Sequence, residues 1–230
     1  MKLPNFPECN HSITQSLAHY SDQALLSAFQ RNPEAGKYFT ALFCRYSALV
    51  FSLISHTAKS PVQGEYLFAL TWRHLLHELG GLELPPAETA KGEKSSFTLQ
   101  NWIINVTALC INQVLLPDVE AIHYSIAEAS PPLWCYVERA LDRLDPTQRL
   151  MVVMAKTFHW SETRIAAYLQ AEGDRVSPTD VKSRLQVAYH QLEASLPDDI
   201  RAIYLEATDA MLADAVEDPE LDELLSPIAL

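Results

Sequence analysis

The chain has 230 residues, of which 48% are hydrophobic and 20% charged, which is typical of a soluble globular protein with one large domain or two small ones. Its formal net charge of -12 argues against strong nonspecific binding to nucleic acid, because nucleic-acid binders usually carry a basic surface. No run of about 18 apolar residues is present, and the first residues lack the apolar segment of a secretory signal. We therefore expect a cytoplasmic protein that does not span a membrane.

The charge is uneven along the chain. Residues 197–230 hold ten acidic side chains and one basic side chain, whereas residues 1–196 hold 19 acidic and 16 basic ones. The body of the protein is therefore nearly neutral, and most of the net charge lies in a C-terminal tail.

The four cysteines are far apart in the sequence and form no C-x-x-C pair. This spacing favours reduced, mostly buried thiols over disulfides or a zinc site. They are Cys9, Cys44, Cys110 and Cys135.

Apolar residues recur at helical spacing through the first half of the chain, and the strand signal is weak, which predicts a helical bundle. Ser21 or Asp22 is placed to cap the first helix, and Ser60 before Pro61 marks the start of another. The segment 35–58 has a wide apolar face, so we expect it at the centre of the bundle. The expected helices cover residues 21–29, 35–58, 60–81 and 97–116.

Two proline-containing segments, 82–96 and 116–132, are expected to be linkers. The helices expected after the second linker cover residues 133–145, 146–158, 161–173 and 177–197. Ser161 and Ser177 are placed as N-caps, and Gly173 stands between the last two helices. Short helices joined by a glycine-containing turn predict a helix-turn-helix.

The last of these helices has two distinct faces. Its apolar stripe consists of Val181, Leu185, Ala188 and Leu192, and its opposite face consists of Thr179, Ser183, Gln186 and His190. Lys182 lies beside the polar face, and Arg184 lies near the apolar edge. These polar side chains can donate hydrogen bonds to bases and phosphates, whereas Asp180 repels phosphate. Judged by the residues alone, an ordinary solvated face is the more common outcome.

Two other groups of side chains leave alternatives open. Phe68 and Trp72 lie one turn apart, and they are either an exposed docking pair or part of the core. His74 and His77 also lie about one turn apart, but a metal site needs further ligands, so ordinary histidines are expected there. No catalytic, metal-binding or cofactor-binding motif is evident, and we expect a protein that is not an enzyme.

From Ser21 to Leu196, the chain resembles the bacterial RNA polymerase sigma factor family in its two-domain, extracytoplasmic-function form. The segments EYLFALTWRHLL and FTLQNWIINVTALCINQ resemble conserved segments of the family's first domain. The segment ALDRLDPTQRLMVVMAKTFHWSETRIAAYL resembles its second domain. The segment SPTDVKSRLQVAYHQL resembles the family pattern S-x-x-T-V-K-S-R-L-x-R-A-x-x-x-L in that second domain.

The resemblance implies an all-α fold of two small helical domains and a function in transcription initiation, through binding of core RNA polymerase and promoter DNA. The implied divisions are an N-terminal extension (1–20), a region-2-like domain (21–116), a linker (117–132), a region-4-like helix-turn-helix domain (133–196) and the acidic tail (197–230).

The resemblance also implies roles for individual residues. The residues expected to bind polymerase are Glu65, Leu67, Phe68, Trp72 and Arg73. The residues expected to bind the minus-ten promoter element are Trp102 and Asn105. The residues expected to bind the minus-thirty-five element are Thr179, Lys182, Ser183, Arg184 and Gln186.

The sequence departs from the family in its charges. Relatives typically carry arginine near the positions of Asn105, Ala108, Leu116 and Pro117, all of which are uncharged here. The turn before Ser177 is also about five residues longer than in the family. Because phosphate contacts position a protein on DNA, the missing charges weaken binding. The alternative function is therefore a sigma-derived interaction protein that binds polymerase or another sigma factor without melting DNA.

The acidic tail has no counterpart in a minimal member of the family. It is either a solvated helix followed by disorder, or a restraint that packs on the second domain or masks a basic surface by Coulomb attraction. An anti-sigma protein is a further candidate partner.

Overall fold

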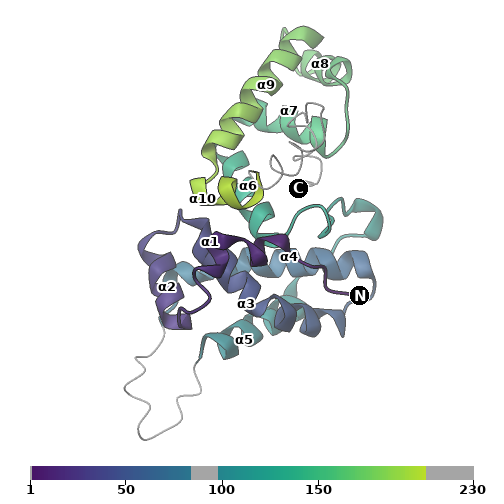
Figure 1. Cartoon of the computed structure of the whole chain (residues 1–230). Helices are drawn as coiled ribbons and strands as arrows, with labels where there is room; N and C mark the ends of the chain where they lie inside the picture. The colour runs from purple at the N-terminus through teal and green to yellow at the C-terminus, as the bar shows by residue number, and fades with distance from the viewer. Residues whose placement is uncertain (1, 84–97, 206–230) are drawn as a thin grey trace, which may run out of the picture.

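The computed structural model describes residues 2–83 and 98–205, and within these ranges all regular secondary structure is helical (Figure 1). The expected all-α fold is therefore confirmed, while most of the first expected linker lies outside the described residues. The α-helices are α1 (Ser12–Gln15), α2 (Asp22–Arg31), α3 (Gly36–Ser55), α4 (Pro61–Glu78), α5 (Leu99–Gln113), α6 (Pro131–Asp142), α7 (Pro146–Lys156), α8 (Glu162–Ala171), α9 (Pro178–Ser195) and α10 (Asp198–Tyr204). Short 3-10 helices are η1 (Pro7–Asn10), η2 (Leu79–Gly81) and η4 (Val119–Ala121).

Helices α2, α3, α4 and α5 form the bundle that the sequence predicts, with α3 at its centre in contact with the other three. Aromatic rings fill its core: Phe43 lies 4.9 Å from Trp72 and 6.1 Å from Phe68 between ring centroids. By length and composition α3 could cross a membrane, but 56% of its most apolar window is buried inside the protein. It is therefore packed as the core helix of a bundle is.

The predicted helix starts are confirmed. Ser21, and not Asp22, caps α2, because its Oγ accepts a hydrogen bond from the backbone N–H of Ala24 at 3.2 Å. Ser60 caps α4 in the same way, with the N–H of Gln63 at 3.1 Å and proline in the first turn. Local sequence therefore fixes where these two helices begin.

Helices α7, α8 and α9 contact one another pairwise and form a three-helix unit (Figure 1). Ser161 caps α8 and Ser177 caps α9, as predicted. Gly173 directly follows the C-cap of α8 and has a φ of +102°, a conformation that residues with a Cβ rarely adopt. The structure thus contains the two short helices that the sequence predicts here, joined by a turn that contains Gly173.

The two halves of the chain are joined through α6, which packs against α3 and α4 of the bundle and also against α9. Buried side chains from both halves belong to one continuous core. The two-domain arrangement implied by the family resemblance is not confirmed, and the expected domain boundaries stay a prediction.

Helix α10, the first part of the acidic tail, lies against α3 and α6. Ile200 and Ile203 are buried, and the Asp199 carboxylate accepts the N–H groups of Gly36 and Lys37 at 3.1 and 3.0 Å. Because α3 has no side-chain cap of its own at Ala35, Asp199 supplies the cap from the other end of the chain. The tail thus begins as a structural element of the bundle.

The N-terminal segment is also part of the packed structure, although the sequence suggests an extension. Phe6 and Leu17 are buried, and a disulfide joins Cys9 in η1 to Cys44 in α3 with the Cα atoms 5.4 Å apart. The expectation that all four cysteines are reduced thiols is therefore wrong for this pair. Residues 7–10 fold back onto α3 across 35 residues of sequence, and residue spacing alone does not reveal such a contact.

The remaining two cysteines agree with the expectation: Cys110 and Cys135 are buried free thiols. The second expected linker is only partly a linker. Tyr124 and Ile126 are buried, and the Tyr124 hydroxyl donates a hydrogen bond to the Ala129 carbonyl at 2.7 Å. This segment therefore has a packed conformation of its own between α5 and α6.

Candidate functional site

Helix α9 presents its predicted contact residues to solvent. Its apolar stripe is buried, with Val181 and Ala188 fully inaccessible. The five residues expected to contact DNA from this helix, namely Thr179, Lys182, Ser183, Arg184 and Gln186, are all exposed. The prediction of a buried apolar stripe opposite an exposed polar face is confirmed.

The N-terminus of α9 is closed by a capping box. Ser177 Oγ accepts from the Asp180 N–H at 3.2 Å, and the Asp180 carboxylate accepts from the Ser177 N–H at 2.8 Å. These hydrogen bonds to Ser177 lower the pKa of Asp180 below its usual value. The Asp180 carboxylate therefore stabilises the first turn of α9. The hydroxyl of the neighbouring Thr179 lies 2.9 Å from that of Ser177.

The turn into α9 is well anchored. The Gln170 side chain donates to the Val176 carbonyl at 2.6 Å, and Val176 itself is buried. On the other side, the Lys156 ammonium of α7 lies 5.1 Å above the ring of Tyr189 in α9. These contacts fix the orientation of α9 on α7 and α8, so its polar face is rigidly placed.

The charge of this three-helix unit is close to zero. Residues 146–196 contain six basic and five acidic residues. Three of the basic side chains are already engaged, since Arg149 pairs with Asp142 at 2.5 Å, the Arg164 guanidinium lies 4.1 Å above the Trp160 ring, and Lys156 lies over Tyr189. The polar face of α9 can therefore donate hydrogen bonds, but it carries little positive charge to attract a duplex.

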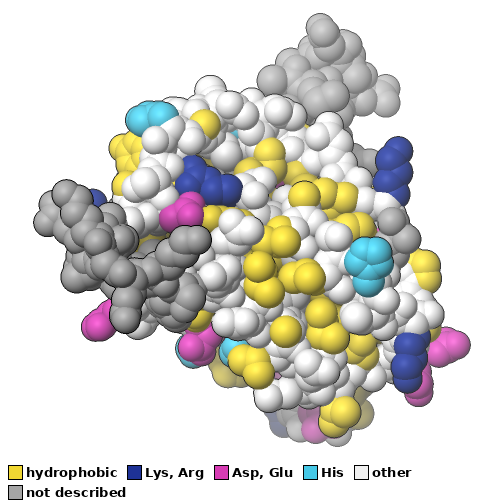
Figure 2. Space-filling model, turned by 90° about the horizontal axis from the view of Figure 1, so that it is seen from below, with side chains coloured by type: hydrophobic (Ala, Val, Ile, Leu, Met, Phe, Trp, Pro, Cys, Tyr) yellow, Lys and Arg dark blue, Asp and Glu magenta, His cyan; other side chains and the backbone are white. Residues whose placement is uncertain are grey.

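The other residues expected to contact DNA lie in α5, at the opposite end of the molecule from α9 (Figure 1). Trp102 is half-buried and Asn105 is exposed. Helix α5 contains no lysine or arginine, and Leu109 on its surface is 51% exposed. Figure 2 shows the face at this end, where apolar side chains gather near the centre and the basic ones in view lie away from it. The two groups of predicted DNA contacts are thus not brought together.

The predicted polymerase-binding residues of α4 are mostly inside the protein. Leu67, Phe68 and Trp72 are buried at 4% exposure or less. They are core residues in this structure. Of the two alternatives for Phe68 and Trp72, the exposed docking pair is therefore wrong in this conformation, and burial in the core is confirmed. The reason is that α4 contacts α3, α5 and α6, so more than one stripe of the helix is covered.

The two remaining α4 residues are engaged within the chain. Arg73 is exposed but pairs with Glu138 of α6 at 2.7 Å and lies 5.3 Å from the Trp134 ring centroid. Glu65 is half-buried and accepts a hydrogen bond from the Ile126 N–H at 3.5 Å. Both side chains hold later segments of the chain against α4.

An open groove of about 540 Å³ lies between α4, α5 and α6. His74 and His77 line it together with Arg73, Glu138 and Asp142, and the arginine and the two carboxylates give its walls both signs of charge. Within residues 2–83 and 98–205, no group of three or more His, Cys, Asp or Glu side chains is placed to hold a metal ion. The pair of histidines thus lines a surface groove.

A buried polar junction was missed by reasoning from the sequence. The Glu8 carboxylate, which is 4% exposed, accepts a hydrogen bond from the Tyr204 hydroxyl at 3.2 Å, and that hydroxyl lies 3.2 Å from Ser130 Oγ. Burial raises the pKa of Glu8 above its usual value. These residues come from η1, the start of α6 and the end of α10, and no sequence signal links such distant positions.

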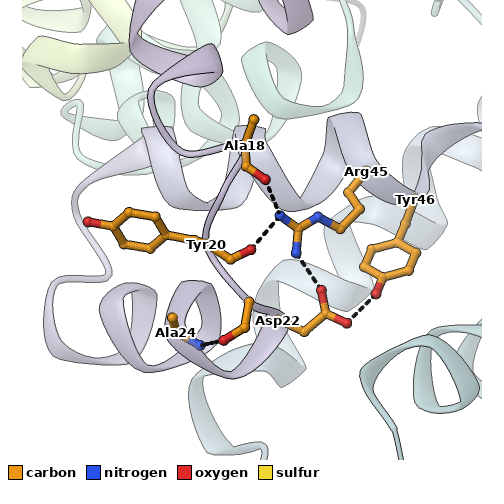
Figure 3. Close-up of polar contacts among 7 residues, drawn as sticks. Ala18, Tyr20, Asp22, Ala24, Arg45 and Tyr46 are labelled. Atoms are coloured by element: carbon orange, nitrogen blue, oxygen red, sulfur yellow. Dashed lines mark hydrogen bonds and ion pairs between the residues drawn. The ribbon is translucent and has the colours of Figure 1, made fainter.

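A second polar network ties the N-terminal segment to α3 (Figure 3). The Arg45 guanidinium donates to Asp22 at 2.6 Å and to the Tyr20 carbonyl at 2.8 Å, and it also reaches the Ala18 carbonyl. The Tyr46 hydroxyl donates to the same Asp22, and burial together with this bond raises the Tyr46 pKa. The connection between α1 and α2 is therefore fixed to α3 next to Cys44.

No family model, curated protein or solved structure matches this chain.

Proposed function

We propose that this chain is a sigma-like transcription initiation factor of the bacterial cytoplasm, which binds core RNA polymerase and contacts promoter DNA through α9. The observation that carries the proposal is the exposed polar face of α9, held by a buried apolar stripe on α7 and α8. Thr179, Ser183 and Gln186 supply hydrogen-bond donors and acceptors of the kind that read base edges.

The near-zero net charge of the α7–α9 unit limits its affinity for DNA. With six basic and five acidic residues, the unit lacks the electrostatic attraction that supplies most nonspecific affinity for DNA. Binding of DNA by the free protein is therefore weak, and polymerase has to hold α9 at the promoter. In such a complex the side chains of α9 contribute selectivity more than affinity.

A second function is favoured by a specific observation in the bundle. Helix α5 has no basic residue, and the aromatic residues of α4 are buried. Both features favour a protein that binds polymerase or another sigma factor without melting DNA. This alternative keeps the polymerase partner and removes the step that needs cations on the bundle.

In vitro transcription with purified core polymerase and the full chain separates the two functions. The initiation factor produces promoter-specific transcripts, and Gln186→Ala lowers their yield roughly fivefold or more, because a lost base contact costs about 1–3 kcal/mol. Gln191→Ala is the matched control, since Gln191 is an exposed glutamine of α9 outside the polar face. Binding of core polymerase without promoter-specific transcripts would exclude the initiation function and leave the interaction protein.

A further inference from the structure

The N-terminal segment covers the aromatic core that α3 and α4 share. The Phe6 ring lies 4.8 Å from that of Phe43 and 6.5 Å from that of Phe68, and Phe6 itself is 6% exposed. Phe68 belongs to the α4 segment for which the sequence predicts polymerase binding. The cover over this segment is therefore a piece of the same chain.

The covering segment has little regular structure of its own. Its two helices, η1 and α1, have four residues each. The backbone hydrogen bonds described for residues 6–17 run within the segment or to Ala18 and Tyr20, which follow it directly, and none reaches the bundle. Its attachment to the bundle therefore rests on side chains, chiefly Phe6, Leu17 and the disulfide from Cys9 to Cys44.

The buried Glu8 side chain destabilises the packing of the segment against the bundle. Burying the Glu8 carboxylate removes it from water, and two hydroxyl groups replace that hydration only in part. At neutral pH this desolvation favours release of the segment. The covalent bond at the neighbouring Cys9 offsets this tendency and keeps the segment in place.

The two cysteines of the disulfide are partly exposed, whereas the two free cysteines are buried. Cys9 and Cys44 are both half-buried, so the bond lies near the surface of the protein, and a thiolate reduces a disulfide by direct attack on one of its sulfurs. Cys110 and Cys135 are buried, and burial raises the pKa of each thiol, which keeps them protonated and unreactive. A disulfide in a cytoplasmic protein, the location proposed above, is usually transient and redox-sensing.

We propose that residues 2–17 form a strap that the Cys9–Cys44 disulfide fastens over the α3–α4 face, and that a dithiol reductant releases the strap to uncover this face for RNA polymerase. The choice of polymerase rests on the proposed function; the release of the strap does not.

The redox step is a thiol–disulfide exchange. One thiolate of the reductant attacks a sulfur of the Cys9–Cys44 bond and forms a mixed disulfide, while the other cysteine leaves as a thiolate and takes up a proton. The second thiol of the reductant then displaces the remaining cysteine. The protein gains two electrons and two protons, and the reductant becomes a disulfide.

The extent of release is limited by the network in Figure 3. Arg45 holds the carbonyls of Ala18 and Tyr20, and neither contact involves the disulfide. Reduction therefore frees residues 2–17 and leaves the chain attached to α3 from Ala18 onward. A strap fixed at one end can close again when the disulfide re-forms.

The first experiment measures release directly on the full chain with and without dithiothreitol. Glu8 is too buried to be cut by a glutamate-specific protease in the closed form, so cleavage after Glu8 should rise roughly tenfold or more on reduction. Amide exchange should rise over residues 6–17 and stay unchanged in α9. The double variant Cys9→Ser/Cys44→Ser should behave as reduced without dithiothreitol, and Cys110→Ser should behave as wild type.

The second experiment measures affinity for core polymerase in the two redox states. The reduced protein should bind roughly tenfold or more tightly. Phe6→Ala with the disulfide intact should also bind more tightly without reductant, because the ring over Phe68 is removed. Release without any gain in affinity would support the strap and contradict the proposed function. Unchanged cleavage and exchange in residues 6–17, or a uniform loss of protection that includes α9, would overturn the strap and leave a structural disulfide.

Discussion

Helices α9 and α4 carry the two segments with the clearest predicted contacts, but the contact residues are exposed on α9 and mostly buried on α4. Helix α9 buries a single stripe against α6, α7 and α8 and leaves all five predicted DNA contacts exposed. Helix α4 lies between α3, α5 and α6, and three of its five predicted polymerase contacts are buried. Local sequence therefore predicts the presence of a helix better than it predicts which of the helix's faces is exposed.

The largest expected effect tests whether the α4 aromatics are core. Trp72→Ala should lower the free energy of unfolding by about 3–5 kcal/mol, because a large buried side chain leaves a cavity. Trp72 is 1% exposed and packs against Phe39 and Phe43. Urea denaturation followed by circular dichroism measures the change.

Arg73→Ala is the neighbouring control for this variant. Arg73 is exposed, and its ion pair with Glu138 lies at the surface, so the loss should stay below about 1 kcal/mol. If Trp72→Ala proves no more destabilising than Arg73→Ala, then Trp72 is not a core residue and the contrast between α4 and α9 disappears.

The second effect concerns the covalent tie of the N-terminal segment to the bundle. Reduction of Cys9–Cys44 should lower the free energy of unfolding by about 2–4 kcal/mol, since the bond closes a loop of 35 residues in the unfolded chain. Denaturation with and without dithiothreitol measures this difference. Helix α9, which has no covalent tie to another segment, should keep its amide protection under native conditions.

The double variant Cys9→Ser/Cys44→Ser provides the control for reagent effects. Its stability should not respond to dithiothreitol, and Cys110→Ser should respond as wild type does, because Cys110 takes no part in the bond. An unchanged wild-type midpoint on reduction contradicts a stabilising role for the disulfide.

Features that depend on neighbouring residues were predictable from the sequence. The helices, the caps at Ser21, Ser60 and Ser177, and the buried stripe of α9 all follow from spacing within one or two turns. Features that depend on distant contacts were not. The pairing of Cys9 with Cys44 and the Glu8–Tyr204 contact join positions whose approach only the tertiary fold determines.

The same distinction between neighbouring and distant contacts applies to the residues of the candidate site. The exposed residues of α9 were predictable because a two-faced helix on a small unit has one face left for solvent. The burial of Phe68 was not, because it depends on the packing of α4 against α3 and on Phe6, more than 60 residues earlier in the chain. The acidic tail shows a related limit: Asp199 caps α3, so a truncation that tests the masking hypothesis has to begin after Leu205, outside the described residues.

The third effect tests the junction between the bundle and α10. A Cβ added at Gly36 would lie 2.3 Å from Ile200 Cγ1, well inside van der Waals contact. Gly36→Ala should therefore destabilise the protein by about 1–3 kcal/mol through overpacking, even though alanine favours helices. Gly80→Ala is the matched control, because nothing lies within 4 Å of its added Cβ, and it should change stability by less than about 0.5 kcal/mol. Thermal denaturation of the two variants compares them, and equal midpoints would contradict the close approach of α10 to α3.

The smallest expected effect on stability is at α9, where a substitution should change DNA binding without changing the stability of the fold. Lys182 is exposed, so Lys182→Gln should change the free energy of unfolding by less than about 0.5 kcal/mol. If Lys182 contacts a phosphate, the variant should bind promoter DNA more weakly in complex with core polymerase. The slope of log affinity against log salt concentration should also fall by about 1, because one fewer counterion is released.

Lys59→Gln makes the same chemical change at an exposed lysine between α3 and α4, and it should leave the salt slope unaltered. Equal slopes for the wild type and both variants would mean that α9 reaches no phosphate, so its exposed face only meets water. A lower slope for Lys182→Gln alone would place the DNA contact on the face that α9 leaves open, and would separate its role from that of α4.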